Sequence, residues 1–331
     1  MGNWKQVAGQ YLGQTLIPSI VVYNNKIYAG TFQGAYLFEW NGIDAFIKVA
    51  DTPVLPVGVY FPIWGIFTLV VFNGELYGTT LFGGHLYKWN GIDAWFLVAK
   101  GTEFTANDSI VFNNKIYSCT YSGGKLLEWS GGNVWVEKAG RLDDQSNVQS
   151  LCEFQGELYA GTYRDGANPG RLFKWDGVSS WVEMAGQYAG SDGIVSLIVF
   201  NGELYGITTG NGLLLKWDGN LWVKVADTLE SQTSLNGLMV YDETLYAGTN
   251  DGMLFKWNGA DSWEKVADPF VENAGGVRPI VLNNKIYAST SYGMLLEYES
   301  EKEVGLIVVD RPSLHSTICD KGGIKPLETY K

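Results

Sequence analysis

One motif recurs seven times along this chain of 331 residues. Each copy has an apolar run, a two-residue turn, an Ile/Leu-Tyr pair, a threonine three residues later, a glycine-rich gap, and in six copies Leu-x-x-Trp. The anchor tyrosines, 40 to 49 residues apart, are Tyr28, Tyr77, Tyr117, Tyr159, Tyr205, Tyr246 and Tyr287. A period near forty with several strand signals per copy is typical of a β-propeller. The sequence therefore predicts an all-β fold of seven blades.

The third copy shows how one blade divides into four antiparallel strands. Residues 109–112 are a short apolar run, so we expect a fully buried innermost strand. Residues 115–120 and 125–129 give the second and third strands, and Asn113-Asn114 suits a tight hairpin turn. Residues 134–139 alternate apolar and polar, as a half-exposed outer strand does.

Large aromatic residues recur at fixed places in the third and outer strands. Twelve of the 13 tryptophans fit this pattern: Trp40, Trp89, Trp129, Trp175, Trp217 and Trp257, and then Trp4, Trp95, Trp135, Trp181, Trp222 and Trp263. Packing of neighbouring twisted sheets needs such residues. We interpret them as core, not as a surface that stacks on sugars.

The N-terminal segment explains how the ring closes. Residues 3–9 match the outer strand of the fourth copy (residues 180–186), whereas the seventh copy loses the motif after its third strand. We therefore expect the N-terminal strand to complete the last blade and leave no sheet edge open. Val304 to Val309 is the alternative strand for that place. The propeller then spans residues 1–302, and residues 303–331 form a tail that packs on it or tethers it.

The spacing of the aromatic pairs resembles that of the kelch repeat. Five of the six complete copies place the two aromatics six residues apart, as in Trp89/Trp95, after an Asn-Gly-x-Leu-Tyr hairpin or a close variant of it. The chain lacks the kelch Gly-Gly doublet, since that place holds pairs such as Ala29-Gly30 and Ser118-Cys119. The resemblance, over about residues 1 to 300, implies a seven-bladed propeller whose loops bind a partner, and it implies no reaction.

Charge excludes several classes of partner. The net charge of −12 disfavours nucleic acid and anionic membranes. No apolar run reaches the length of a spanning helix, and residues 1–9 lack the pattern of a secretory signal. We expect no membrane insertion, and a location in the cytoplasm or on a surface or particle reached without a signal. The three cysteines, Cys119, Cys152 and Cys319, have no disulfide or zinc spacing, so the first two are expected as buried thiols.

The sequence singles out no catalytic group. Its only histidines are His85 and His315, which are placed far apart in the pattern, and its arginines are few. Loop acids such as Asp251 match no calcium spacing and are interpreted as solvated turn residues. We expect no enzyme activity, no metal and no cofactor, although many carboxylate pairs remain open.

A polar ring is expected at the channel mouth. Nine residues before each anchor tyrosine, where the innermost strand begins, stand Ser19, Thr68, Asp108, Ser150, Ser196, Gly237 and Arg278. Six are polar, and Arg278 suits a carboxylate or phosphate. The structural alternative is that ordered water bridges neighbouring blades there. A threonine three residues after each anchor is expected to satisfy loop backbone groups.

Aromatic and basic residues in the loops complete the candidate site. The long loop 51–66 holds Tyr60, Phe61 and Trp64, and loops between second and third strands hold Phe32, Phe82, Tyr121, Tyr163, Arg164 and Tyr292. Such residues suit sugar stacking or protein recognition. The alternative is that the aromatics and prolines of loop 51–66 form a cap packed on the barrel.

These features are compatible with three functions. The favoured one is a non-catalytic propeller that binds a glycan or another polar ligand through its loop face, as a surface or virion appendage. The alternative is a kelch-type scaffold with a protein partner. A hydrolase or lyase with an active site at the channel mouth is less favoured. The propeller itself is expected to be monomeric unless the tail assembles it.

Overall fold

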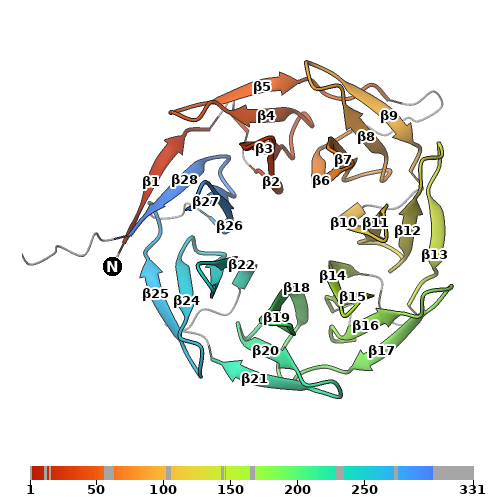
Figure 1. Cartoon of the computed structure of the whole chain (residues 1–331), viewed down its shortest axis with the longest axis vertical. Coiled ribbons are helices and arrows are strands. Elements are labelled where there is room, and N and C mark those ends of the chain that lie inside the picture. The colour runs from red at the N-terminus through yellow and green to blue at the C-terminus, as the bar shows by residue number, and fades with distance from the viewer. Residues whose placement is uncertain are drawn as a thin grey trace, which may run out of the picture. The chain divides into compact units, whose positions relative to one another are not determined.

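A ring of seven four-stranded antiparallel sheets surrounds a central channel (Figure 1). The computed structural model describes residues 2–10, 13–14, 16–55, 63–101, 106–142, 145, 147–164, 168–227, 235–271 and 275–300. All regular elements in these ranges are strands, and none is a helix that could span a membrane. We number the blades 1 to 7 from the N-terminus.

Blades 1 to 6 run outward from the channel in chain order, and blade 7 does so up to its third strand. The innermost strands are β2 (Ser19–Tyr23), β6 (Ile66–Phe72), β10 (Ala106–Phe112), β14 (Val148–Phe154), β18 (Gly193–Phe200), β22 (Leu235–Tyr241) and β26 (Val277–Leu282). The second strands are β3 (Lys26–Gly30), β7 (Glu75–Thr80), β11 (Lys115–Thr120), β15 (Glu157–Thr162), β19 (Glu203–Thr209), β23 (Thr244–Thr249) and β27 (Lys285–Thr290).

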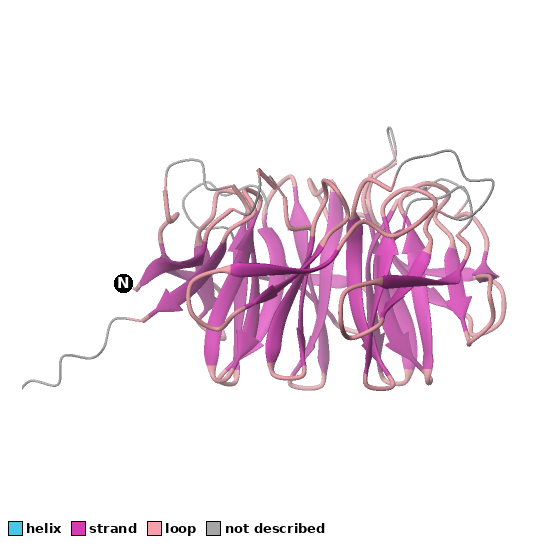
Figure 2. Cartoon of the chain, turned by 90° about the horizontal axis from the view of Figure 1, so that it is seen from above, coloured by secondary structure: helices cyan, strands magenta, loops and turns pink. Residues whose placement is uncertain are grey.

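The outer half of each blade holds two further strands. The third strands are β4 (Leu37–Trp40), β8 (Leu86–Trp89), β12 (Leu126–Trp129), β16 (Leu172–Trp175), β20 (Leu214–Trp217), β24 (Leu254–Trp257) and β28 (Leu295–Glu299). The outer strands are β5 (Phe46–Ala50), β9 (Trp95–Ala99), β13 (Val136–Ala139), β17 (Trp181–Ala185), β21 (Trp222–Ala226), β25 (Trp263–Ala267) and β1 (Asn3–Ala8). Seen from the side, the connecting loops gather at the two ends of the strands (Figure 2).

The N-terminal strand closes the ring, as predicted. β1 pairs antiparallel with β28, with Trp4 opposite Tyr298, and so becomes the outer strand of blade 7. The Trp4 indole Nε1 also donates a hydrogen bond to the carbonyl of Gly252 in blade 6, at 3.1 Å. The alternative strand at residues 304–309, like the whole tail, lies outside the described residues.

The strand bounds of blade 3 differ from prediction at three places, and the smallest difference is in the third strand, which begins at Leu126, one residue late. The innermost strand begins at Ala106, three residues early, because a β-bulge between Ala106 and Asp108 interrupts the alternation. The outer strand begins at Val136, two residues late. The predicted hairpin turn is confirmed, since Asn113 and Asn114 have φ angles of 46° and 58°.

The prediction of a fully buried innermost strand is wrong. All five residues of β2 are half-buried, whereas four of the five residues of β3 are buried. The innermost strand is the edge strand that borders the channel, so water reaches it. The second strand has a hydrogen-bonded strand on each side and is therefore shielded from the channel.

Aromatic pairs join neighbouring blades at five of the seven joints in the described part of the chain. The anchor tyrosine of one blade packs against the third-strand tryptophan of the following blade, with ring centroids 5.2 Å apart for Tyr28 and Trp89. The same contact joins blade 7 to blade 1 through Tyr287 and Trp40, at 5.0 Å. Eleven of the twelve repeated tryptophans are buried, and Trp181 is partly buried. The repeat therefore encodes the joints between blades.

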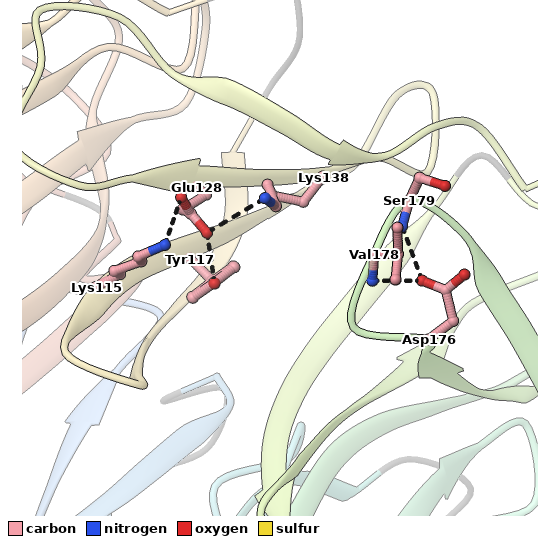
Figure 3. Close-up of polar contacts among 7 residues, drawn as sticks. All are labelled: Lys115, Tyr117, Glu128, Lys138, Asp176, Val178 and Ser179. Carbon is pink, nitrogen blue, oxygen red and sulfur yellow. Dashed lines mark hydrogen bonds and ion pairs between the residues drawn. The ribbon is translucent and has the colours of Figure 1, made fainter.

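A charge pair recurs across the hairpin of the second and third strands. In blade 3, Glu128 is buried and accepts hydrogen bonds from Lys115 at 2.9 Å and from the Tyr117 hydroxyl at 2.6 Å, with Lys138 at 3.8 Å (Figure 3). Burial opposes ionisation, but these bonds outweigh it and lower the pKa of Glu128. This buried carboxylate is thus fully engaged inside its own blade.

Candidate functional site

A polar cavity opens at the mouth of the channel, at the end where the innermost strands begin. Its volume is about 530 Å³. All six polar residues predicted for the ring line it: Ser19, Thr68, Asp108, Ser150, Ser196 and Arg278. In blades 2 to 6 a β-bulge lies directly before the ring position, as between Ile194 and Ser196. The repeat thus brings the ring positions of the blades to one place, and six of them carry a side chain that lines the cavity.

Most ring side chains bridge neighbouring blades directly. In four blades the ring oxygen accepts the backbone N–H that follows the ring position of the next blade. These bonds join Ser19 to Leu69 (2.8 Å), Asp108 to Leu151 (2.8 Å), Ser150 to Leu197 (3.0 Å) and Ser196 to Leu238 (3.4 Å). The Thr68 hydroxyl instead donates to Ser109 Oγ at 2.9 Å. Direct hydrogen bonds therefore bridge neighbouring blades at these positions, where ordered water was the alternative inferred from the sequence.

Asp108 is the acidic member of the ring. Its Oδ1 accepts the N–H of Ser109 and its Oδ2 that of Leu151, both at 2.8 Å. Burial raises the pKa of this carboxyl to about 6 although both bonds favour the ionised form. Both oxygens are thus committed to the joint between blades 3 and 4.

Arg278 is the basic member, and it differs from the other ring residues in its contacts. Among the described residues, the guanidinium has no hydrogen-bond or ion-pair partner, and burial alone lowers the pKa of Arg278. Its accessible surface is intermediate because it faces the channel, yet protein atoms crowd it on nearly every other side. A cation is therefore presented to the cavity without a counter-charge.

Amide side chains were not predicted but also line the cavity. Asn107, Gln149 and Asn236 directly precede ring residues. Asn107 donates to the Val148 carbonyl at 2.7 Å, and Asn236 to the Val277 carbonyl at 3.4 Å. The polar character of positions 107, 149 and 236 is visible in the sequence, but only the bulge shows that these side chains reach the channel.

The predicted loop residues fall into separate groups. Tyr121 and Tyr163 line the cavity. Trp64 does not; it is half exposed and packs edge-on against Phe32 and Phe82, with centroids 6.5 and 5.7 Å away.

The remaining predicted loop residues stand apart from the cavity. Arg164 pairs with Asp192 at 3.2 Å. Tyr292 is exposed and is not among the lining residues. Tyr60 and Phe61 lie outside the described residues.

The threonine ring has the structural role that was expected. All seven side chains are buried, and each Oγ1 accepts a loop N–H at 2.7 to 3.1 Å, from Tyr36, His85, Lys125, Arg171, Leu213, Met253 and Met294. These hydroxyls hold the loops that follow the second strands, and none of them lines the cavity.

Other reactive side chains do not line the cavity. His85 is buried, accepts the Gly101 N–H on Nδ1 at 2.9 Å, and has a pKa lowered by burial and by Lys100. Cys119 and Cys152 are free buried thiols, as predicted, and burial raises the pKa of Cys152 to about 12. Within the described ranges, no three His, Cys, Asp or Glu side chains come together to hold a metal ion.

Comparison with known proteins supports the fold alone. No protein-family profile and no curated protein matches this chain. Virginiamycin B lyase from Staphylococcus aureus superposes with a TM-score of 0.73 at 10% identity, over 90% of this chain and 99% of that chain. YCF48 from Cyanidioschyzon merolae gives 0.62 at 12%, over 90% and 99%. The WD40 propeller domain of Doa1 gives 0.65 at 12%, over 91% and 98%.

These similarities establish a seven-bladed propeller and leave the kelch resemblance unconfirmed. The similar structures include a lyase and a WD40 domain, and YCF48 was also solved with a bound D1 peptide. Proteins of different activity therefore share this fold, and the function of this chain must be argued from its own cavity.

Proposed function

We propose that this protein is a non-catalytic propeller that binds a polar ligand, such as a glycan, in the cavity at its channel mouth. One observation carries the proposal: a single cavity of about 530 Å³ is lined by the ring residues and by two loop tyrosines. Such a volume suits a small ligand or the end of a larger one. Tyr121, about half exposed, offers a stacking face beside amides that can donate and accept hydrogen bonds.

The charged and catalytic groups support binding over chemistry. Both oxygens of Asp108 are held by backbone N–H groups, and His85 lies outside the cavity. The kelch-like spacing of the aromatic pairs is consistent with a binding module. We therefore assign the cavity to recognition.

A glycan array that includes neutral and acidic sugars tests this proposal. We expect a saturable signal that Tyr121→Ala and Tyr163→Ala each weaken by about tenfold, since loss of one stacking contact costs on the order of 1 kcal/mol. Tyr292→Ala is the matched control, because Tyr292 is an exposed loop tyrosine outside the cavity. Signals that Tyr292→Ala weakens as much as Tyr121→Ala would place binding elsewhere.

A protein or peptide partner is the second candidate. The cluster of exposed Trp64 and Phe82 with half-buried Phe32 favours it, because exposed aromatics often anchor protein interfaces. A blank array together with a partner captured by the wild type and lost with Trp64→Ala would support this candidate over the first.

A further inference from the structure

The ring of direct bonds between blades is interrupted on both sides of blade 7. At the joint from blade 6 to blade 7, the ring residue is Gly237, which has no side chain. The residue that would donate is Pro279, which has no N–H. Both halves of the bridge are missing together at this one joint.

Blade 7 itself carries Arg278 at the ring position. An arginine has donors only, so it cannot accept the N–H of the next blade as the serines do. The other polar ring side chains, apart from Arg278, each have a hydrogen-bond partner within the ring. Arg278 is therefore the ring residue whose polar group is left for something other than the joint.

An unpaired guanidinium in this position is costly for the fold alone. Burial removes hydration from the cation and lowers the pKa of Arg278, and no ion pair among the described residues offsets that loss. Arg278 lines the cavity, as do Asn236 and Asn250 from blade 6. It can therefore meet a ligand that enters through the mouth.

Resting on the proposed function, we infer that the ligand carries a carboxylate, which seats on the Arg278 guanidinium. The planar fork of arginine matches the two oxygens of a carboxylate. A single negative charge fits the setting, because the cavity also contains Asp108 and the chain carries a net charge of −12. An acidic sugar, such as a sialic or uronic acid unit, has this chemistry together with hydroxyls for the amides.

Paired probes that differ only in the charge test the inference. Isothermal titration would compare sialyllactose with the methyl ester of its carboxyl group, and galacturonic acid with its methyl ester. We expect the wild type to bind the acidic member of a pair about 10–100-fold more tightly, as the loss of a charged hydrogen bond predicts. Arg278→Gln should remove that preference, and Arg278→Lys should keep part of it. Arg164→Gln, which changes an exposed arginine paired with Asp192 outside the cavity, should leave it intact.

The outcomes separate this inference from the proposed function. Equal binding of acidic and neutral probes, unchanged by Arg278→Gln, would overturn the carboxylate and leave a polar-ligand site standing. Tighter binding of a sugar phosphate than of the carboxylates would overturn the single-charge argument. No binding of any sugar by the wild type would overturn both proposals.

Thermal unfolding without ligand tests the unpaired state of Arg278 independently. Removing an uncompensated charge should leave the Tm of Arg278→Gln equal to or above that of the wild type. A clear fall in Tm would show that Arg278 holds the fold together, and the inference would then be wrong.

Discussion

At the scale of single residues, the ring position joins neighbouring blades through two kinds of side chain, a hydroxyl and a carboxylate. Serine at this position joins blades with one short side chain, while Asp108 makes the same joint with a carboxylate. The carboxylate adds a second bond, to its own neighbour Ser109, but it must be buried to do so. The stability of this joint therefore depends on pH, which would not be so with a serine in place of Asp108.

Stability should reveal this difference as a pH dependence. The folded-state pKa of Asp108 is about 6, above the unfolded value of 3.8, so the folded state binds the proton more tightly. The stability that this group contributes is present below about pH 4 and is lost as pH rises through about 6. Between pH 4 and 7, the free energy of unfolding of Asp108→Ser should rise relative to that of the wild type by up to about 3 kcal/mol.

Denaturant titrations of both proteins at pH 4, 5, 6 and 7 measure this gain. The thiols of Cys119 and Cys152 lie near Asp108 but stay neutral in this range, because burial raises the pKa of each. Ser150→Ala is the control, since it removes a joint without a titratable group and should cost the same at every pH. If the free energies of unfolding of Asp108→Ser and the wild type changed in parallel with pH, the assignment of this pH dependence to Asp108 would be wrong.

At the scale of elements, the hairpin of second and third strands carries an ion pair, and which strand holds the positive charge differs among blades. Blades 1, 3 and 7 place lysine on the second strand and glutamate on the third, as in Lys115 and Glu128. Blades 2, 4 and 5 reverse the order, as in Glu203 and Lys216. Either order satisfies the same diagonal contact, so the pairing of charges matters more than their identity.

Blade 6 lacks this pair and offers a test of its value. Thr244 stands where the other blades have a charge, and Lys256 has no ion-pair partner among the described residues. Thr244→Glu should therefore stabilise the protein by about 0.2–1 kcal/mol, the range for exposed pairs. Differential scanning calorimetry at low salt measures it, with Thr244→Gln as the uncharged control of equal length. Salt screens an exposed ion pair, so if the glutamate variant remained more stable than the glutamine variant in about 1 M salt, the gain would not come from the ion pair.

The sequence allowed the strands and the ring positions to be predicted because the repeat places them at fixed distances from each anchor tyrosine. Bulges were missed, since an extra residue at Asn107 leaves no mark on the apolar pattern. The separation of Trp64 from Tyr121 was missed for another reason. Both are loop aromatics, and only the tertiary fold decides which one faces the channel. The lack of a partner for Arg278 likewise depends on the neighbouring blades.

At the scale of the whole molecule, closure of the ring depends on one strand from the far end of the chain. β1 supplies the outer strand of blade 7, and Trp4 is buried in a cluster with Met239, Val277 and Leu296. The hydrogen bond from Trp4 to Gly252 also links that strand to blade 6. The N-terminal strand thus joins three parts of the ring: the last blade, the one before it, and blade 1, which follows it in the chain.

Removal of residues 1–9 should therefore open the ring. The truncated chain exposes the edge of β28 and the pocket of Trp4, so we expect the Tm to fall by at least about 10 °C. We also expect self-association in size-exclusion chromatography, because a free sheet edge pairs with other chains. A synthetic peptide of residues 2–10 should restore the Tm by filling the vacant place, and the same peptide with Trp4→Ala should not, since loss of a buried tryptophan side chain costs about 3–5 kcal/mol. A chain that ends at Ser300 keeps all four strands of blade 7 and should unfold at the wild-type temperature. If truncation at Ser300 lowered the Tm while loss of residues 1–9 did not, closure would belong to the other end of the chain.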